Sequence, residues 1–553
     1  MSYLKRHGTR RVSQRAPLPG QAANSAGGFA WAVDSWTRLR RFLVLGSEGG
    51  SYYASEWKLT RENAHAVEEC VCEDGPRAVA EIVRVSTGGR APKNDPALYA
   101  LALAAGVGDV ETRQAALAAL PQVARTGTHL FQFALFVEGF RGWGRSLRRA
   151  VGRWYAAQAV DALAYQAVKY RQRVGVTHRD LLRLAHPARR VGAGNPELDV
   201  SDEHARLFEW IVRGGETDGL PRLLEGFARA QEATTSRETA ALVREYRLPR
   251  EALKPEHLTS PEVWEALLDE MPMTALIRNL ATMTRVGVLA PGSDGTAKAV
   301  AQLGDAERIR RARVHPIAVL AALRTYASGR GARSRGEWNP VREIVDALDD
   351  AFYTAFGNVA PAGKRLLLAL DVSGSMTGGS VAGVPGLSPR DASAALALVT
   401  AATESRYEVV GFFAAKGGFK KRGRQVWSGY ADGLTPLPIS PRQRLDDAVE
   451  TVSDLPFGGT DCALPMLYAQ AHKREIDTFV IYTDSETWAG EIHPAQALRD
   501  YRHASGIEAR LVVVGMVSNG FSIADPSDPG MLDVVGFDTA TPQLISDFAR
   551  GAL

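Results

Sequence analysis

The stretch LLLALDVSGSMTGGS, residues 366–380, decides the fold of the second half of this 553-residue chain. An apolar run ends at Asp371, and two serines and several glycines follow it. A continuous apolar run of this length is typical of a strand buried on both faces of a parallel sheet. The acid and the serines then lie at the carboxyl end of a strand, where open α/β sheets bind their ligands.

Three further apolar runs repeat this pattern downstream, with amphipathic helical stretches between them. They are YEVVGFF (407–413), DTFVIYTD (477–484) and ARLVVVGMVS (509–518). Because strand and helix alternate, we predict a doubly wound α/β domain over residues 357–553.

Upstream of about residue 356 the hydrophobic period changes. Apolar residues recur at three- and four-residue spacings, as in PALYALALAAG (96–106) and VETRQAALAALPQVA (110–124). Many such helices in tandem predict an α-solenoid of irregular helix pairs over residues 24–356. The predicted architecture is therefore α plus α/β, with a helical-repeat region followed by the doubly wound domain.

The composition, with 45% hydrophobic and 23% charged residues, is typical of a soluble globular protein. No apolar run approaches the roughly 20 residues of a membrane helix, so we expect no membrane association. The start, MSYLKRHGTRRVSQRAPLPGQ, lacks the apolar core of a secretory signal, and we expect residues 1–23 to form a disordered basic arm. Three cysteines are too few for a disulfide framework, which favours reduced thiols in a cytoplasmic protein.

Charge is distributed unevenly along the chain. The first 356 residues hold 49 Lys+Arg and 40 Asp+Glu, whereas residues 357–553 hold 17 and 22. A polyanion such as nucleic acid would therefore meet the front half of the chain. A helical surface that merely favours arginine would give the same counts.

Oxygen-bearing side chains follow two of the predicted strands and precede one helix. Asp371 with Ser373 and Ser375 follows the first strand, Asp484 follows the strand TFVIYT, and Thr460 lies in the loop PFGGTDC. Such hard oxygen ligands suit Mg²⁺, Mn²⁺ or Ca²⁺ better than zinc. A phosphate loop is excluded because no G-x-x-x-x-G-K-[ST] motif is present. Simple capping of the next helix remains the alternative for Asp371 and its serines.

These five residues closely resemble the metal-ion-dependent adhesion site of von Willebrand factor A domains. The resemblance implies that Ser373, Ser375 and Thr460 bind a divalent cation, Mg²⁺ or Mn²⁺, directly, and that Asp371 and Asp484 bind it directly or through water. It does not imply what the cation holds, because the same domain serves adhesion, assembly and chelatase proteins.

A second candidate site is the basic stretch VKYRQRVGVTHRDLLRLAHP, residues 168–187. Its His178-Arg179-Asp180 triplet matches a kinase catalytic loop, but neither a Gly-rich loop nor D-F-G accompanies it. Two helices meeting at Gly175 would array its cations for RNA phosphates, with ordinary surface ion pairs as the alternative. The cations are Lys169, Arg171, Arg173, His178, Arg179, Arg183 and His186.

Several stretches along residues 24–553 together resemble the Ro 60 kDa family of TROVE-domain RNA-binding proteins, in its bacterial Ro-like (Rsr) form. They include RFLVLGSEGGSYY (41–53), PEVWEALLDEMPMTALIRNLATMT (261–284), RVHPIAVLAALRTYASGRG (313–331), FGGTDCALPM (457–466) and SNGFSIADPSDPGMLDVVGFDT (518–539). Only the basic arm, and the loop GGSVAGVPGLSPR (378–390), fall outside the pattern.

The resemblance implies a monomeric ring of HEAT-like helical repeats closed by the von Willebrand A domain. Its basic outer surface would bind Y RNA, a small stem-loop RNA, through Lys169, Arg173 and His186. Its hole would accept single-stranded ends of misfolded noncoding RNA, and Y RNA would tether polynucleotide phosphorylase. On charge density alone we add the cations of RGWGRSLRRAVGRWY (141–155), which are Arg141, Arg145, Arg148 and Arg149.

We therefore expect a non-catalytic RNA-binding ribonucleoprotein component that acts in noncoding-RNA quality control and turnover. The alternative is a metal-dependent adhesion or assembly protein that binds a protein ligand through its von Willebrand A domain. A nuclease is a weaker alternative, because Asp371 and Asp484 are too few acids for a two-metal phosphodiester mechanism.

Overall fold

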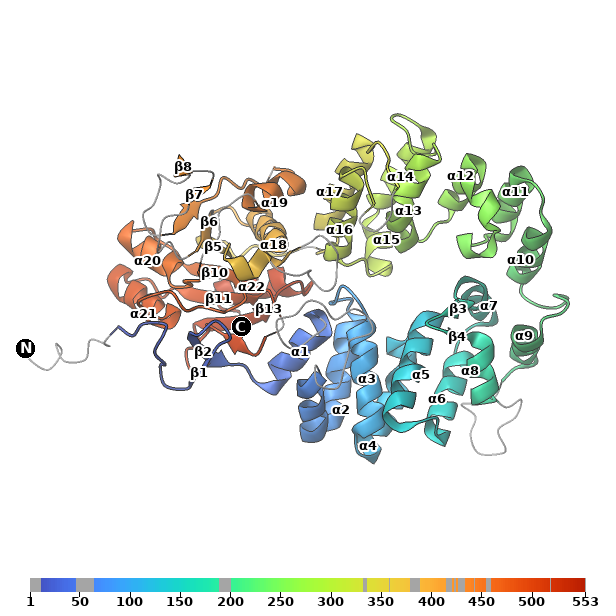
Figure 1. The fold of residues 1–553 in the computed structure, drawn as a ribbon, viewed down its shortest axis with the longest axis horizontal. Helices are drawn as coiled ribbons and strands as arrows, with labels where there is room; N and C mark the ends of the chain where they lie inside the picture. The colour runs from blue at the N-terminus through green and yellow to red at the C-terminus, as the bar shows by residue number, and fades with distance from the viewer. Residues whose placement is uncertain are drawn as a thin grey trace, which may run out of the picture. The chain divides into compact units, whose positions relative to one another are not determined.

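The chain folds into two compact units, each coloured by sequence in Figure 1. The helical unit comprises residues 64–89 and 93–355, and the α/β unit comprises residues 1–63, 90–92 and 356–553. No helix among the residues that the structure describes is long and apolar enough to cross a membrane. The computed structural model describes residues 11–45, 64–187, 200–331, 336–357, 359–377, 388–413, 420–421, 424–425, 433–441, 443–453, 459–517 and 519–552.

The helical unit confirms the predicted run of helix pairs. Helices α2, α4, α6 and α8 pack successively against one another, and α3 packs against α5 (Figure 1). Residues with short polar side chains cap the N-termini of several of these helices. At α4, for example, the Asp109 side chain accepts a hydrogen bond from Thr112 N at 2.8 Å. The helices are α2 (His65–Thr87), α3 (Asp95–Val107), α4 (Val110–Val123), α5 (Gly127–Arg141), α6 (Arg145–Ala156), α7 (Val160–Lys169), α8 (His178–Ala185), α9 (Asp202–Arg213), α10 (Arg222–Glu232), α11 (Ser236–Tyr246), α12 (Pro261–Asp269), α13 (Met273–Arg285), α14 (Asp294–Leu303), α15 (Ala306–Arg311), α16 (Pro316–Ala327) and α17 (Arg342–Thr354).

A six-stranded sheet forms the centre of the α/β unit, in the order β13-β11-β10-β5-β6-β9. All neighbours are parallel except β6 and β9, so the predicted parallel sheet carries one antiparallel edge strand. The strands are β5 (Leu366–Asp371), β6 (Tyr407–Phe412), β9 (Leu434–Pro436), β10 (Thr478–Thr483), β11 (Arg510–Gly515) and β13 (Met531–Val535), with a separate small hairpin of β7 (Lys420–Lys421) and β8 (Arg424–Gln425).

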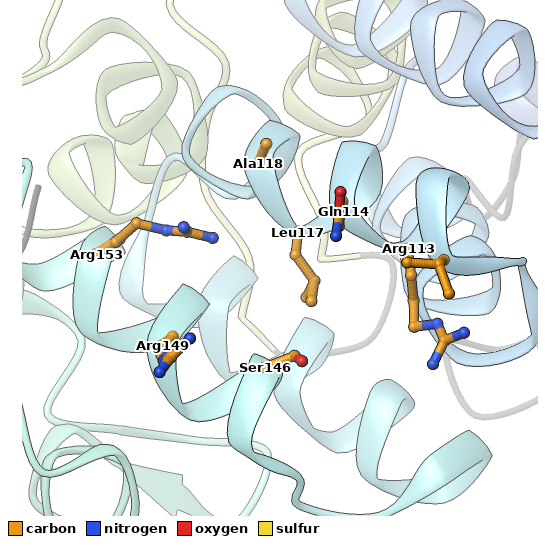
Figure 2. A pocket seen from close by; sticks show the side chains of 8 residues that line it. Arg113, Gln114, Leu117, Ala118, Ser146, Arg149 and Arg153 are labelled. Atoms are coloured by element: carbon orange, nitrogen blue, oxygen red, sulfur yellow. The ribbon is translucent and has the colours of Figure 1, made fainter. Parts of the chain in front are cut away.

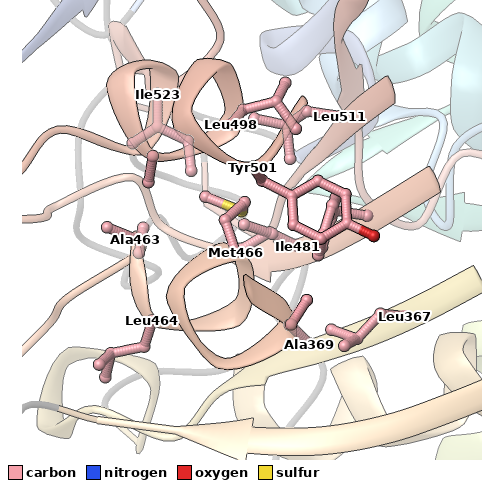
Figure 3. Packing of buried hydrophobic residues seen from close by; sticks show 14 of the residues in the cluster. Leu367, Ala369, Ala463, Leu464, Met466, Ile481, Leu498, Tyr501, Leu511 and Ile523 are labelled. Carbon is pink, nitrogen blue, oxygen red and sulfur yellow. The ribbon is translucent and has the colours of Figure 1, made fainter. Parts of the chain in front are cut away.

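Helices cover both faces of this sheet, as the continuous apolar runs predicted. Alternate strand residues, such as Leu367, Ile481 and Leu511, pack with Met466 and Tyr501 of α20 and α21 (Figure 3). The intervening residues face α18, where the hydroxyl oxygens of Tyr482 and Thr400 lie 3.3 Å apart. The helices are α18 (Pro389–Thr403), α19 (Leu445–Ser453), α20 (Leu464–Ala471), α21 (Pro494–Ser505) and α22 (Thr541–Arg550).

Residues 11–23 contradict our prediction of a disordered arm over residues 1–23, whereas residues 1–10 lie outside the described residues. Residues 11–23 lie against the α/β unit, and Gln14 is completely buried there. Strands β1 (Gln21–Ala23) and β2 (Phe29–Ala32) form a small sheet with β12 (Phe521–Ser522), and helix α1 (Ser35–Leu45) contacts β13. We had predicted that residues 24–45 belong to the helical region. The structure places them in the α/β unit instead.

Candidate metal centre and nucleic-acid interface

The carboxylate edge lies where β5 and β10 end side by side in the sheet. We use this name for Asp371, Ser373, Ser375, Thr460 and Asp484. Asp371 accepts hydrogen bonds from Ser373 N at 2.9 Å and from the Thr483 hydroxyl at 2.6 Å, and the hydroxyl oxygens of Ser373 and Ser375 lie 3.1 Å apart. The structure thus brings the D-x-S-x-S residues together as predicted from the sequence.

The loop that carries Thr460 is joined to the loop after β10. The buried Thr460 accepts hydrogen bonds at its carbonyl oxygen from Trp488 N and Ala489 N, each at 3.1 Å. Asp484 is buried, and its side chain accepts a hydrogen bond from Glu486 N at 3.0 Å. All three loops of the predicted site therefore meet at one edge of the sheet.

Burial disfavours the ionised form of both Asp371 and Asp484 at this edge. Burial raises the pKa of Asp371, although hydrogen bonds from Ser373 and Thr483 and the charge of Arg390 oppose the rise. Burial and the charge of Asp371 raise the pKa of Asp484 to about 7, against a hydrogen bond from Ser375. Two buried acids beside neutral hydroxyls are a donor set that a hard divalent cation fits, because its charge relieves their repulsion.

Two acidic side chains near this edge, Asp461 and Glu486, accept hydrogen bonds from other groups of the protein. Asp461 accepts hydrogen bonds from Gln14 Nε2 at 2.7 Å and Ala463 N at 3.0 Å. Glu486 accepts one from Ala26 N at 3.0 Å.

No group of three or more His, Cys, Asp or Glu side chains suited to a metal ion occurs among the described residues. None of Cys70, Cys72 and Cys462 forms a disulfide among the described residues.

The second candidate site is built on a β-hairpin, where we had expected two helices to meet at Gly175. Strands β3 (Gln172–Arg173) and β4 (Val176–Thr177) are joined by Val174 and Gly175, with φ of 49° and 80°. Positive φ at both positions defines the two-residue turn that matches the twist of paired strands. Helix α8 then begins with a capping box between Thr177 and Asp180, so the H-R-D triplet is the start of a helix.

This hairpin and the two helices beside it present a group of cations, which we call the hairpin cluster: Lys169, Arg171, Arg173, Arg179, Arg183 and His186. All are exposed except Lys169, which is half-buried. The Lys169 ammonium lies 5.1 Å and 5.6 Å from the ring centroids of Tyr165 and Tyr170, and the Arg171 guanidinium lies 5.1 Å from that of Phe227. Lys169 and Arg171 thus lie against aromatic rings, of which Phe227 is buried and Tyr165 and Tyr170 are half-buried.

His178 does not belong to this cluster, although its position in the sequence suggested so. Its side chain is 2% exposed, and its Nδ1 lies 2.9 Å from the hydroxyl of Tyr155. Burial lowers the pKa of His178 to about 4. The ring packs edge-on against Phe131 with centroids 4.8 Å apart. His178 is a core residue of the helical unit.

The arginines at the end of α5 and on α6, added on charge density, are also exposed: Arg141, Arg145, Arg148 and Arg149. Arg149 lines a groove of about 460 Å³ between α4 and α6. Figure 2 shows the side chains that line this groove. Arg113 and Arg153 line the same groove with Ser146 and Gln114, above an apolar floor that includes Leu117. None of the described residues that line it is acidic.

Sequence reasoning missed Arg113 and Arg153 of this groove. The spacing of Arg145, Arg149 and Arg153 by four residues places them on one face of a helix and would have indicated Arg153. Arg113 comes from another helix, and only the packing of α4 on α6 reveals it.

Comparisons with known proteins extend over both units. A model of the TROVE domain matches residues 22–213 and 247–324, and a model of the Ro60 vWA domain matches residues 365–549. The RNA-binding protein RO60 of Deinococcus radiodurans is 44% identical over 550 residues, which cover 99% of this chain and 98% of that protein. The RNA-binding protein RO60 of Caenorhabditis elegans is 36% identical over 97% of this chain and 91% of that protein.

A solved structure agrees with the sequence relatives. The crystal structure of the Deinococcus radiodurans RO (RSR) protein matches with a TM-score of 0.67 at 44% identity, covering 94% of this chain and 100% of that one. Because both family models match and the identity extends along nearly the whole length, this chain belongs to the Ro60 family of TROVE-domain proteins.

Proposed function

We propose that this protein binds RNA through the hairpin cluster and acts in the quality control and turnover of noncoding RNA. The observation that carries the proposal is the group of cations around one hairpin, all exposed except the half-buried Lys169. Exposed cations supply the phosphate contacts that dominate nucleic-acid affinity. The names of the two relatives, both RNA-binding proteins, support the same function.

The RNA that fits this surface best is a folded stem-loop of the Y type. The family resemblance implies that Lys169, Arg173 and His186 face the Y RNA, and all three lie in the hairpin cluster. The exposed arginines of α6 and the groove beside α4 would extend the contact along the backbone of a duplex. Single-stranded ends of misfolded RNA would enter the opening that the family resemblance implies, and polynucleotide phosphorylase would be recruited through the Y RNA.

Salt-dependent RNA binding tests this proposal. Each phosphate contact contributes about 0.7–0.9 to the slope of log affinity against log salt. Changing both Lys169 and Arg173 to Ala should therefore lower the slope for a stem-loop RNA by about 1.5 and weaken binding at moderate salt. Exposed Arg237 of α11 is the control, and Arg237→Gln should leave the slope unchanged. An unchanged slope in the double variant would show that the RNA binds elsewhere.

We also propose that the carboxylate edge binds Mg²⁺ or Mn²⁺. Ser373, Ser375 and Thr460 would bind the ion through their hydroxyl oxygens, and Asp371 and Asp484 would bind it directly or through water. The bound ion would supply a positive centre with free positions for a carboxylate or phosphate oxygen. The raised pKa values of the two acids support this proposal, because a cation relieves the cost of burying their charges.

Thermal unfolding tests the metal centre. An ion that binds only the folded state adds RT ln(1 + [L]/Kd), which is about 2.7 kcal/mol at a hundredfold excess over Kd. The melting temperature should rise with Mg²⁺ or Mn²⁺ in the native protein, and the rise should vanish when Ser373 and Ser375 are both changed to Ala. Identical melting curves of the native protein with and without the ions would sink the proposal.

A second candidate function is metal-dependent adhesion or assembly. In that case the ion at the carboxylate edge would bind a carboxylate of a protein partner. The nucleic acid that accompanies the purified protein distinguishes the two functions. A high absorbance ratio at 260 to 280 nm, followed by sequencing of defined small RNAs, supports RNA binding. Cleavage of labelled RNA that needs Mg²⁺ and is lost in Asp371→Ala would instead make the protein a nuclease.

A further inference from the structure

The N-terminal segment, by which we mean residues 11–34, lies directly on the loops of the carboxylate edge. Gln14 is the residue of this segment through which it contacts two of those loops. The Gln14 side chain is 0% exposed. Its Nε2 donates to Asp461 Oδ1 at 2.7 Å and to the Ile492 carbonyl at 2.9 Å. Its Oε1 accepts from the Thr487 hydroxyl at 2.5 Å and from Gly490 N at 3.1 Å. These four bonds use the full hydrogen-bonding capacity of the amide.

The partners of Gln14 sit beside the proposed metal ligands on two different loops. Asp461 follows Thr460 directly, and Thr487 lies three residues after Asp484. The Thr487 hydroxyl also accepts a hydrogen bond from Cys462 N at 3.2 Å. One amide thus joins the loop of Thr460 to the loop of Asp484, across more than 440 residues of sequence.

Two glycines show how closely the N-terminal segment fits these loops. A Cβ atom on Gly490 would lie 2.3 Å from Gln14 Nε2 and 2.4 Å from Asp461 Oδ1. A Cβ atom on Gly28 would lie 1.9 Å from the carbonyl oxygen of Thr487. All three distances are below 3.0 Å, so a side chain at either glycine would displace the atoms that the segment and the loops place there.

Further contacts hold the loop of Asp484 from the same side. Asn24 Nδ2 donates to the Thr487 carbonyl at 2.8 Å. The completely buried Arg41 of α1 donates to the carbonyl and side-chain oxygens of Asn519 at 2.5 Å and 3.1 Å. Asn519 in turn donates to the carbonyl oxygen of Asp484 at 2.5 Å. The N-terminal segment and α1 therefore support the loop that carries a proposed ligand.

We infer that the N-terminal segment is part of the metal centre, with Gln14 as a positioning residue that, together with the direct bonds between the two loops, fixes Thr460 and Asp484 relative to each other. The inference rests on the proposed metal centre, and Gln14 itself would not touch the ion. Residues that orient metal ligands typically change metal affinity 10- to 100-fold when they are replaced. Loss of Gln14 should accordingly weaken metal binding by about tenfold or more.

Calorimetric titration of the full chain with Mn²⁺ tests the inference, because it measures affinity and not only stability. Gln14→Ala should raise the dissociation constant about tenfold or more. Thr487→Val removes the hydroxyl that Gln14 accepts from while keeping the shape of the side chain, and should also weaken binding. The matched control is Gln21→Ala in the same segment, since Gln21 bonds to Leu18 and His493 and should leave the dissociation constant unchanged.

The outcomes separate the inference from the proposed metal centre. Mn²⁺ binding that disappears in the Ser373→Ala/Ser375→Ala variant establishes the centre. Equal dissociation constants for the native protein and for folded Gln14→Ala and Thr487→Val would then overturn the role of Gln14 alone. Absence of any Mn²⁺ binding by the native protein would overturn the centre and the inference together.

Discussion

At the scale of single residues, His178 makes the stability of the helical unit depend on pH. Its pKa is lowered to about 4 by burial, whereas an unfolded chain binds the proton near pH 6.5. Between these values the unfolded state holds more protons than the folded state, so stability is full above pH 6.5 and falls as the pH drops toward 4. At pH 5 this one side chain should cost about 2 kcal/mol.

Urea unfolding at pH 7 and pH 5 measures this effect. His178→Gln removes the titrating group, so its loss of stability between the two pH values should be about 2 kcal/mol smaller than that of the native protein. The exposed His503 is the control, and His503→Gln should keep the native dependence on pH. Parallel pH dependence in the native protein and His178→Gln would contradict the prediction.

The residues that could be predicted from the sequence are those whose environment is set locally. Asp371 ends one buried strand and Asp484 directly follows another, so their position at the sheet edge followed from the apolar runs. His178 looked like one more surface cation, because its burial depends on Phe131 and Tyr155 of other helices. Gln14 gave no signal at all, since its partners lie more than 440 residues away.

At the scale of elements, the hairpin between α7 and α8 contains one unfavourable backbone position. Val174 has φ of 49°, a region in which a β-branched residue is strained, whereas asparagine adopts it readily. Val174→Asn should therefore stabilise the helical unit by about 1 kcal/mol and raise its melting temperature. Val176→Asn, placed in the adjoining strand, is the matched control and should not stabilise. A melting temperature unchanged or lowered by Val174→Asn would contradict this reading of the turn.

The turn sequence Val174-Gly175 also explains why the hairpin was not predicted from the sequence. Two-residue hairpin turns are usually recognised by Asn-Gly or Asp-Gly, and the strands here are only two residues each. Without that signal, the helical periods on both sides of Gly175 predicted two helices meeting directly. The long central strands were predictable because each is a complete apolar run.

At the scale of the whole molecule, the sequence located one boundary and missed the other. The change from helical to strand period near residue 356 coincides with the start of the last segment of the α/β unit at Phe356. The assignment of residues 11–45 to that same unit was not predictable from periodicity, because a period identifies an element and not its partner. Buried Arg41, bound to Asp533 at 2.8 Å, shows that this partnership depends on long-range contacts.

Because the proposed RNA site and the proposed metal site belong to different units, we expect RNA binding to be independent of metal binding. The hairpin cluster lies in the helical unit, and the carboxylate edge lies in the α/β unit. Changes at sites without shared partners add independently to within about 0.5 kcal/mol, which is about a twofold change in affinity. Chelation with EDTA, or Asp371→Ala in a protein shown to be folded, should therefore leave the affinity for stem-loop RNA within about twofold and its salt slope unaltered.

Filter binding across a salt series measures both quantities, with the Lys169→Ala/Arg173→Ala protein as the positive control for lost contacts. RNA binding that is abolished by EDTA or by Asp371→Ala, while the Lys169→Ala/Arg173→Ala protein binds normally, would place the RNA on the metal-bearing unit instead.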